Sequence, residues 1–302
     1  MVDITIIGSG VAGMTAALYA LRSNKDVLIR EKESYGGQIA KSPRVENYPT
    51  KKSVSGSVLV DEIFDQISDL GVKFELEDVE SIDKVDDYYV VKTNYNTYET
   101  KCVIIANGVT SRKLNLENED KFLGNGVYYC AICDGPFFAG KEVTLVGDGN
   151  SAMQYALMLS DYCTKVKMVT MFDKFFGEKS LEKAIRENSK IEIIPNAVAN
   201  RLMGTDKLTA VEFKDKDNKL FTIDTEALFV AIGQVPDNKR FENVVDLDKA
   251  GYIIADESCK TKSEGIFVAG DCRVKTIRQV ATAMGDGAVA GTEAVNYLNT
   301  RG

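Results

Sequence analysis

The most reactive feature of the sequence is a pair of cysteines, Cys130 and Cys133, separated by two residues and followed by Asp134 and Gly135. Such a pair can close a small disulfide ring or be opened by two electrons, and its spacing can lower a thiol pKa to about 7 or below. A structural zinc site would need a second pair or histidines. The chain has no histidine, and its other four cysteines stand singly, so a redox role is favoured over zinc.

The lack of histidine also restricts acid–base catalysis beside the cysteine pair. The adjacent carboxyl of Asp134 is the obvious proton donor to the two thiols. Because Asp-Gly is a common turn sequence, a purely structural role for Asp134 remains the alternative.

The chain has 302 residues, of which 44% are hydrophobic and 27% charged, a composition typical of a globular protein of two domains. Its net charge of −8 argues against nucleic acid as a partner. No apolar run in the sequence approaches the ~18 residues that span a bilayer, and the first residues lead into a strand without a leader pattern. Mostly single cysteines are typical of a reducing compartment. We therefore expect a cytoplasmic protein that makes no use of a membrane.

A dinucleotide fingerprint follows the first predicted strand, at residues 3–8. Gly8, Gly10 and Gly13 have the spacing of a tight turn that admits a pyrophosphate onto a helix N-terminus. A helical pattern comes next, and a strand at residues 26–29 leads to Glu31, which is placed to accept ribose hydroxyls. This order of strand, turn, helix, strand and acid predicts nucleotide binding.

The chain then repeats this unit. An apolar strand at residues 143–146 runs into a second glycine turn from Gly147, and 23 residues beyond Gly147, the same interval as from Gly8 to Glu31, stands Thr170. An acid there would favour NAD, and arginines would favour NADP. Thr170 is neither, and Asp148 adds a carboxylate inside the turn. A second dinucleotide domain of unusual specificity is one interpretation; the residues favour a domain that kept its fold and lost its ligand.

Near the C-terminus, an apolar strand ends in Gly270-Asp271, which predicts a carboxylate at the ligand-binding edge of a doubly wound sheet. Arg278 and Gln279 open the last predicted helix, residues 280–298. The N-terminal dipole of that helix can stabilise negative charge on a bound ring.

Together these motifs resemble the low-molecular-weight thioredoxin reductases of the flavin disulfide reductase class, over essentially the whole chain. The resemblance implies an α/β fold with two dinucleotide-binding, Rossmann-like, three-layer domains, the second inserted into the first. Residues 1–112 and 242–302 would form a discontinuous FAD-binding domain. Residues 113–241 would form an NADPH-domain-like domain that carries the redox disulfide. The resemblance also implies a homodimer.

The resemblance implies that Cys133 lies nearer the flavin, that Cys130 attacks the disulfide of thioredoxin, and that Asp134 serves the thiols as an acid. The turn and Glu31 would hold the adenosine half of FAD, whereas Gln38, Asn47 and the segment from Asp271 to Val280 would contact its ribityl and ring portions. The full set of FAD contacts implied in this way is Gly8, Ser9, Gly10, Val11, Ala12, Gly13, Glu31, Lys32, Gly37, Gln38, Asn47, Val79, Ala106, Asn107, Gly108, Gly270, Asp271, Arg278, Gln279 and Val280.

The sequence departs from the family pattern at the end of the second unit's second strand. NADPH-dependent members carry a His-Arg-Arg…Arg run there, whereas this chain has Thr170, Met171, Phe172 and Phe176. In this respect it resembles the ferredoxin-dependent flavin thioredoxin reductases of clostridia, and we expect reduced ferredoxin as the electron donor. The alternatives are an NAD(P)H-dependent thioredoxin reductase with atypical contacts, a flavin dithiol oxidase, and a flavoprotein whose FAD is only structural.

Overall fold

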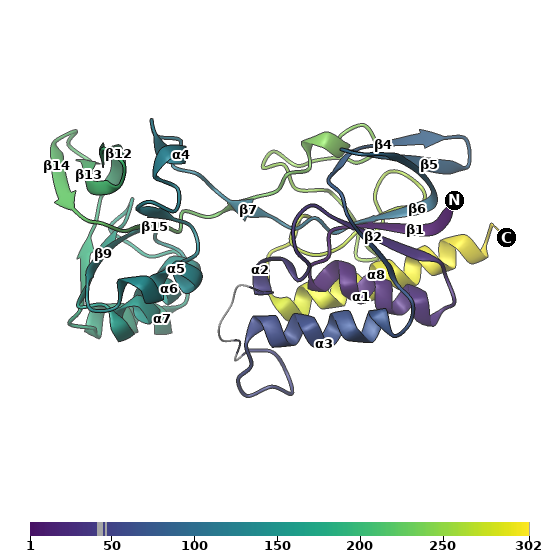
Figure 1. The fold of residues 1–302 in the computed structure, drawn as a ribbon, viewed down its shortest axis with the longest axis horizontal. Helices are drawn as coiled ribbons and strands as arrows, with labels where there is room; N and C mark the ends of the chain where they lie inside the picture. The colour runs from purple at the N-terminus through teal and green to yellow at the C-terminus, as the bar shows by residue number, and fades with distance from the viewer. Residues whose placement is uncertain (41–44, 46, 302) are drawn as a thin grey trace. The chain divides into compact units, whose positions relative to one another are not determined.

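The computed structural model describes residues 1–40, 45 and 47–301, with the side chain of Cys133 outside the description. The chain forms two compact units, Met1–Thr110 with Val235–Gly302, and Ser111–Gln234 (Figure 1). The second unit is inserted into the first. The chain crosses between them at β7 (Thr110–Ser111) and β16 (Gln234–Val235), which pair with each other.

The chain re-enters the first unit at Val235, whereas the sequence analysis placed this boundary later in the chain, at residue 242. Residues 235–241 belong to the first unit because Phe241 is fully buried in that unit's core, beside Ile7 and Val79. The side-chain amide of Asn238 is likewise buried, and it donates to the carbonyl oxygens of Gly251 and Cys272, each at 2.9 Å.

The first unit contains a mixed seven-stranded sheet in the order β3-β2-β1-β6-β5-β4, with β17 also pairing with β6. Strands β1, β2, β3 and β17 run parallel to their neighbours, whereas β4, β5 and β6 form an antiparallel meander. The register aligns Ile7 with Arg30 and with Ile105, so the residues that follow β1, β2 and β6 share one edge of the sheet. The strands are β1 (Val2–Ile7), β2 (Val27–Glu31), β3 (Lys73–Leu76), β4 (Val79–Val85), β5 (Tyr88–Thr93), β6 (Thr97–Ile105) and β17 (Ile266–Val268).

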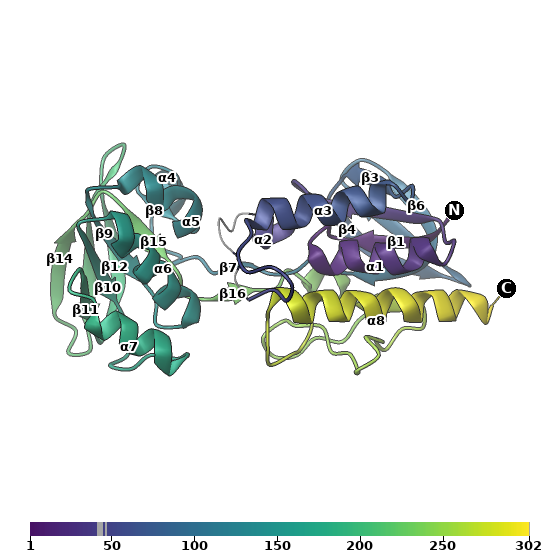
Figure 2. The ribbon, with the colours of Figure 1, turned by 90° about the horizontal axis from the view of Figure 1, so that it is seen from below.

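Helices α1 (Val11–Arg22), α3 (Gly56–Ser68) and α8 (Val280–Asn299) cover one face of this sheet (Figures 1 and 2). The alternation of the strands separates two cores, because successive side chains point to opposite faces. Ile4, Ile6 and Ile29 pack against the helices. Ile7 and Ile105 face the other side, where they pack with the meander and with η2 (Lys239–Phe241). The short helix α2 (Gly37–Ala40) follows β2.

The second unit has a five-stranded parallel sheet in the order β11-β10-β9-β15-β8. Helices α5, α6 and α7 pack on one face, and an antiparallel sheet of β12, β13 and β14 covers the other (Figure 1). Its elements are α4 (Glu119–Phe122), β8 (Val127–Tyr128), α5 (Ala131–Asp134), η1 (Gly135–Phe138), β9 (Glu142–Val146), α6 (Asn150–Tyr162), β10 (Lys165–Val169), α7 (Lys179–Glu187), β11 (Ile191–Ile194), β12 (Ala197–Gly204), β13 (Leu208–Asp215), β14 (Leu220–Asp224) and β15 (Leu228–Val230).

Both units therefore have the dinucleotide-binding architecture that the sequence predicts, and the predicted α/β fold is confirmed. Within the described part of the chain, no helix is long and apolar enough to cross a membrane.

At two positions, Gly287 and Gly291, the contact between α8 and α1 leaves no room for a side chain. A Cβ added to Gly287 would lie 2.3 Å from the carbonyl oxygen of Ala12, and one added to Gly291 would lie 2.6 Å from that of Ala16. The two helices therefore meet backbone to backbone, which only glycine at these positions permits.

We predict that Gly287→Ala destabilises the protein by roughly 1–3 kcal/mol, because the new methyl group overpacks the helix contact. Gly285 is the matched control, since it is exposed in the same helix and a Cβ there would meet no atom within 4 Å. Gly285→Ala should stabilise the helix by about 0.5–1 kcal/mol. Denaturant unfolding of the two variants measures both effects; equal unfolding midpoints would contradict the close approach.

Candidate functional site

Cys130 lies immediately before α5 and is disulfide-bonded. The backbone N–H of Asp134 donates to the carbonyl oxygen of Cys130 at 3.0 Å, so a single helical turn spans the motif. The predicted partner is Cys133, whose side chain lies outside the described residues. The disulfide is in the second unit, as predicted for the redox pair.

The other four cysteines are buried free thiols. Burial raises the pKa of Cys259 to about 11 and that of Cys272 to about 12, and it also raises the pKa of Cys102 and of Cys163. Because the thiolate is the reactive form, these four thiols are inert at neutral pH. The thiol chemistry of the chain is therefore confined to the Cys130 motif.

Gly135 follows the motif and packs directly against α6. A Cβ at this position would lie 2.2 Å from the hydroxyl oxygen of Tyr162 and 2.8 Å from Cδ2 of Leu159. The Tyr162 hydroxyl is shielded from solvent and has no hydrogen-bond partner among the described residues, and burial raises the pKa of Tyr162 to about 12. Gly135 is thus required by this close approach, in addition to any turn preference.

Further bonds attach the segment after the cysteines to the end of α6. The Gly140 N–H donates to the carbonyl oxygen of Tyr162 at 2.9 Å, and the Cys163 thiol donates to that of Phe138 at 3.4 Å. Burial raises the pKa of the Tyr128 hydroxyl, and the negative charge of Asp134 adds to that shift. Asp134 follows the second cysteine in the sequence, and its role as a proton donor stays a prediction.

The first glycine turn lies at the carboxyl edge of the large sheet. Gly8 has a φ of +101°, and a Cβ there would meet the carbonyl oxygen of Ala106 at 2.4 Å. A Cβ on Gly10 would meet no described atom within 4 Å, so the N-terminus of α1 has room for a ligand at this position. Helix N-termini attract phosphate through their free N–H groups and their dipole.

The carboxylate of Glu31 turns back onto this loop. Its Oε2 accepts the N–H and the hydroxyl of Ser9, at 2.8 and 2.9 Å, and its Oε1 accepts the N–H of Lys32 at 2.8 Å. Gly36 pairs with Gly10 in a parallel bridge, and a Cβ on Gly37 would lie 3.2 Å from the Cα of Gly10. The structure therefore brings Ser9 and Glu31 together at the turn, and it places Lys32 and Gly37 beside them.

Two predicted residues far apart in sequence meet at the start of α8. The amide of Asn47 donates to the side-chain oxygen of Gln279 at 2.9 Å, and Gln279 forms a capping box with Thr282. Val280 is the first residue of that helix. Gln38 lies elsewhere on the same unit, where its side-chain amide donates to the carbonyl oxygen of Val109 at 2.6 Å.

Two buried acceptor atoms at this edge lack partners. Oδ1 of Asp271 and Oδ1 of Asn107 are shielded from solvent and accept no hydrogen bond from the described residues. Burial raises the pKa of the Asp271 carboxyl. An unpaired buried acceptor costs about 1–3 kcal/mol, so a ligand that donates to it binds favourably.

These features fit FAD. The open N-terminus of α1 suits the pyrophosphate, and the two unpaired acceptors suit hydroxyl groups. Two of the predicted residues make contacts within the protein. Arg278 donates to the carbonyl oxygen of Asp271 at 3.3 Å, and its guanidinium lies 4.1 Å from the centre of the Tyr252 ring. The carbonyl oxygen of Val79 accepts a hydrogen bond from Nη1 of Arg240 at 2.7 Å. Their contacts with FAD, like those of the remaining predicted residues, stay predictions.

The end of β10 differs from the end of β2, its counterpart in the first unit. Thr170 is buried, and its hydroxyl donates to the carbonyl oxygen of Phe172 at 2.8 Å. Met171, Phe172 and Phe176 are exposed, and Lys174 lies over the Phe176 ring at 4.7 Å. A neutral, internally bonded hydroxyl and an apolar surface thus stand where a ribose-binding acid or arginine would be. Burial also raises the pKa of Asp148 in the adjoining turn.

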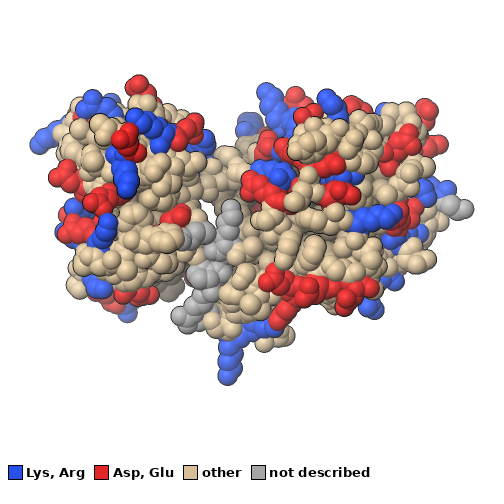
Figure 3. Space-filling view, in the orientation of Figure 1, with Lys and Arg blue, Asp and Glu red and all other residues tan. Residues whose placement is uncertain are grey.

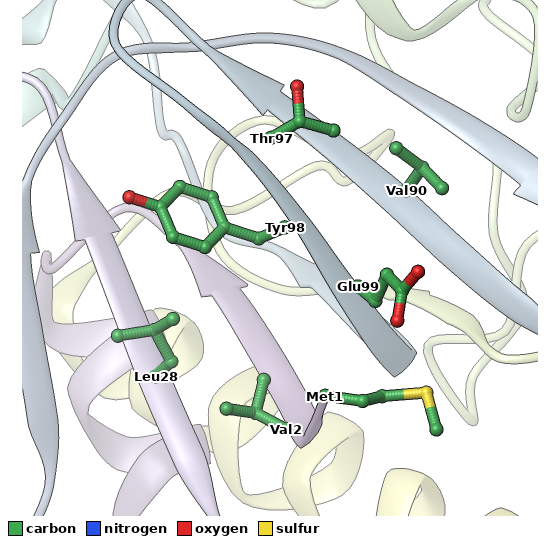
Figure 4. Close-up of a pocket in the computed structure, with 7 residues that line it drawn as sticks. All are labelled: Met1, Val2, Leu28, Val90, Thr97, Tyr98 and Glu99. Atoms are coloured by element: carbon green, nitrogen blue, oxygen red, sulfur yellow. The ribbon is translucent and has the colours of Figure 1, made fainter.

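A cavity of about 390 Å³ opens in the first unit at the amino ends of β1 and β6, opposite the edge that carries Gly8 (Figure 4). Met1, Val2 and Tyr98 are among the residues that line it, and none of the predicted site residues does. In the described part of the chain, no group of three or more His, Cys, Asp or Glu residues could hold a metal ion.

The fold and the disulfide motif define a disulfide reductase built from two dinucleotide-type domains. Residues 2–287 match the family model described as "Pyridine nucleotide-disulphide oxidoreductase". The thioredoxin reductase of Listeria monocytogenes is 36% identical over 300 residues, which cover 98% of this chain and 93% of that one. The chain therefore belongs to the pyridine nucleotide-disulphide oxidoreductase family and, within it, to the low-molecular-weight thioredoxin reductases, as the sequence analysis predicted.

Solved structures agree with this assignment. The crystal structure of Lactococcus lactis thioredoxin reductase (FR conformation) has a TM-score of 0.94 and 34% identity, with coverage of 99% of this chain and 100% of that one. A ferredoxin-flavin thioredoxin reductase from Clostridium acetobutylicum has a TM-score of 0.55 and 30% identity, with coverage of 99% and 98%. Similarity alone therefore does not distinguish the ferredoxin-dependent branch.

We predict that Gly135→Ala destabilises the second unit by roughly 1–3 kcal/mol, because its methyl group collides with the Tyr162 hydroxyl. Adding Tyr162→Phe removes that oxygen and should recover about half of the loss or more, whereas Tyr162→Phe alone should cost little because the hydroxyl is unpartnered. Urea unfolding of the two single variants and the double variant gives the coupling free energy. If the two changes in unfolding free energy simply added in the double variant, the contact with Tyr162 would not be the reason that glycine is required at position 135.

Proposed function

We propose that this protein reduces thioredoxin, taking electrons from reduced ferredoxin through FAD bound on the first unit and the Cys130–Cys133 pair. The observation that carries the choice of donor is Thr170, which is buried and bonded to its own chain at the slot of the ribose-binding residue. The family resemblance extends the proposal to a homodimer in the cytoplasm.

When bound, FAD supplies a carrier that exchanges electrons singly or in pairs, which joins a one-electron donor to a two-electron disulfide. The chain's own residues bind and orient it. The N-terminus of α1 would hold the phosphates. The unpaired Oδ1 atoms of Asn107 and Asp271 would accept hydroxyl groups of the cofactor, and Asn47 and Gln279, bonded to each other at the start of α8, would contact its ring portion.

The second half of the reaction is thiol–disulfide exchange. The thiolate of Cys130 attacks one sulfur of the thioredoxin disulfide, which forms a mixed disulfide and releases the other thioredoxin sulfur as a thiolate that takes up a proton. The Cys133 thiol gives up its proton and attacks Cys130 Sγ, which restores the pair and releases the second thioredoxin thiol. Asp134 donates and accepts these protons, since the chain has no histidine.

Energetics is compatible with ferredoxin as the donor, and a ferredoxin-dependent enzyme is found among the relatives. Iron–sulfur donors with a reduction potential of about −400 mV are strong enough to reduce a thioredoxin with a potential of about −270 mV. A relative that is 30% identical is a ferredoxin-flavin thioredoxin reductase. The outer face of α3 exposes Asp61, Glu62 and Asp65 in an acidic band, which would repel a negatively charged donor protein (Figure 3).

A second candidate is a thioredoxin reductase that uses NAD(P)H with atypical contacts. The feature that favours it is the second glycine turn, in which Gly147 retains a φ of +145° and Gly149 and Ala152 retain their places at the start of α6. This turn could still receive a pyrophosphate, although Thr170 offers the ribose no charge.

An anaerobic titration distinguishes the donors. We predict that reduced ferredoxin bleaches the flavin absorbance and that subsequent addition of oxidised thioredoxin restores it, whereas NADPH and NADH leave the flavin oxidised. Rapid stoichiometric bleaching by NADPH would instead establish the second candidate. Turnover with oxygen and a dithiol, without activity toward thioredoxin, would identify a dithiol oxidase.

We predict that Cys130→Ser abolishes thioredoxin reduction, by at least roughly a thousandfold, because the attacking thiolate is lost. FAD binding and reduction of the flavin by ferredoxin should be unchanged, as absorbance spectra of the variant will show. Cys163→Ala is the matched control, since Cys163 is a free thiol in the same unit, and this variant should keep thioredoxin activity. Loss of flavin from Cys130→Ser would contradict the assigned role.

A further inference from the structure

Asp286, on α8, makes three polar contacts with the loop that precedes this helix. Its Oδ2 accepts the backbone N–H of Gly270 at 3.1 Å and Nζ of Lys275 at 2.8 Å, and its Oδ1 accepts Nη1 of Arg273 at 3.2 Å. The side chain of Asp286 is 14% exposed, and those of Arg273 and Lys275 are 13% and 9% exposed. The Asp286 carboxylate therefore contacts two nearly buried cations and fixes one backbone donor, and Lys275 also interacts electrostatically with Asp271.

The backbone that Asp286 holds belongs to the Gly270–Asp271 turn of the proposed flavin site. Gly270 has a φ of +83°, and a Cβ there would lie 2.8 Å from Cβ of Ala12, near the start of α1. Asp271 presents the buried, unpartnered Oδ1. The turn thus packs against the start of α1 and is also hydrogen-bonded to the Asp286 carboxylate.

The two cations are also tied to the surrounding backbone. Nη2 of Arg273 donates to the carbonyl oxygen of Asp256 at 2.9 Å, and Nζ of Lys275 donates to that of Thr282 at 3.3 Å. Neither cation can therefore reorient freely toward solvent when the charge of Asp286 is removed. Its removal would leave an added positive charge beside the turn, at low exposure, where charges are weakly screened.

We propose that Asp286 is a positioning residue for the flavin: it acts through the Gly270–Asp271 turn to aim the Asp271 carboxylate at the ligand and to set the charge beside the ring. This inference rests on the proposed binding of FAD to the first unit. Asp286 itself touches neither the cofactor nor a substrate in this assignment.

The test compares three variants in the full-length holoprotein with a control. Asp286→Asn keeps an acceptor oxygen and removes the charge, and Asp286→Ala removes both. Lys275→Met combined with Asp286→Asn restores the local charge balance. Asp246→Asn is the control, because Asp246 pairs with Lys262 at 2.8 Å on the surface of the same unit. The readouts are the FAD dissociation constant by flavin fluorescence, the flavin midpoint potential by anaerobic titration, and the thermal unfolding of each FAD-free chain.

We expect Asp286→Ala to weaken FAD binding at least tenfold. Asp286→Asn should make the midpoint potential more positive by about 30 mV, which corresponds to a tenfold change in a two-electron equilibrium. Lys275→Met in the Asp286→Asn background should reverse that shift, and Asp246→Asn should match the parent. A structural role alone would lower the unfolding temperature without this charge-dependent reversal.

Parental affinity in Asp286→Ala together with a parental potential in Asp286→Asn would overturn the proposal, even if the variants unfold at a lower temperature. A parent chain that binds no FAD would instead refute the proposed function. Measuring FAD binding by the parent chain therefore tests the proposed function first, and the Asp286 variants then test the positioning role.

Discussion

The backbone contact between α1 and α8 determines how the two ends of the chain form one site. Gly287 and Gly291 allow α8 to lie against the carbonyl oxygens of Ala12 and Ala16. This contact places the turn at Gly270 within van der Waals distance of the start of α1, and it brings Asp286 behind that turn. The N-terminus of α1 and the buried carboxylate of Asp271, from opposite ends of the chain, thereby share one sheet edge. The ligand-binding geometry of the first unit therefore depends on residues that have no functional groups of their own.

The second unit shows that this architecture can persist while its ligand contacts change. Its parallel sheet and α6 are stabilised by a hydrophobic core that includes Leu145, Met153 and Met168, none of which would touch a nucleotide. In the first unit Glu31 turns its carboxylate onto the glycine turn, whereas in the second Thr170 satisfies its hydroxyl within its own chain. Because packing and ligand recognition use different residues, the fold places little constraint on the electron donor.

The reactivity of the six cysteines is likewise set by their environment. Burial keeps four thiols protonated, so the disulfide motif alone can exchange electrons at neutral pH. Tight packing of Gly135 against Tyr162 anchors the end of that motif. Asp134, adjacent in sequence, is the residue that we propose as the acid, since the chain has no histidine.

The sequence by itself determined the features encoded by short spacings: the two glycine turns, the intervals that contrast Glu31 with Thr170, and the cysteine pair. Such spacings specify a local turn and its neighbouring strand, and the structure keeps them. Only the tertiary structure brought Asn47 to Gln279, 232 residues away, and placed Phe241 in the first core, Tyr162 against Gly135 and Asp286 behind Gly270. Contacts between distant segments depend on how helices and sheets pack, and no local pattern in the chain records that packing.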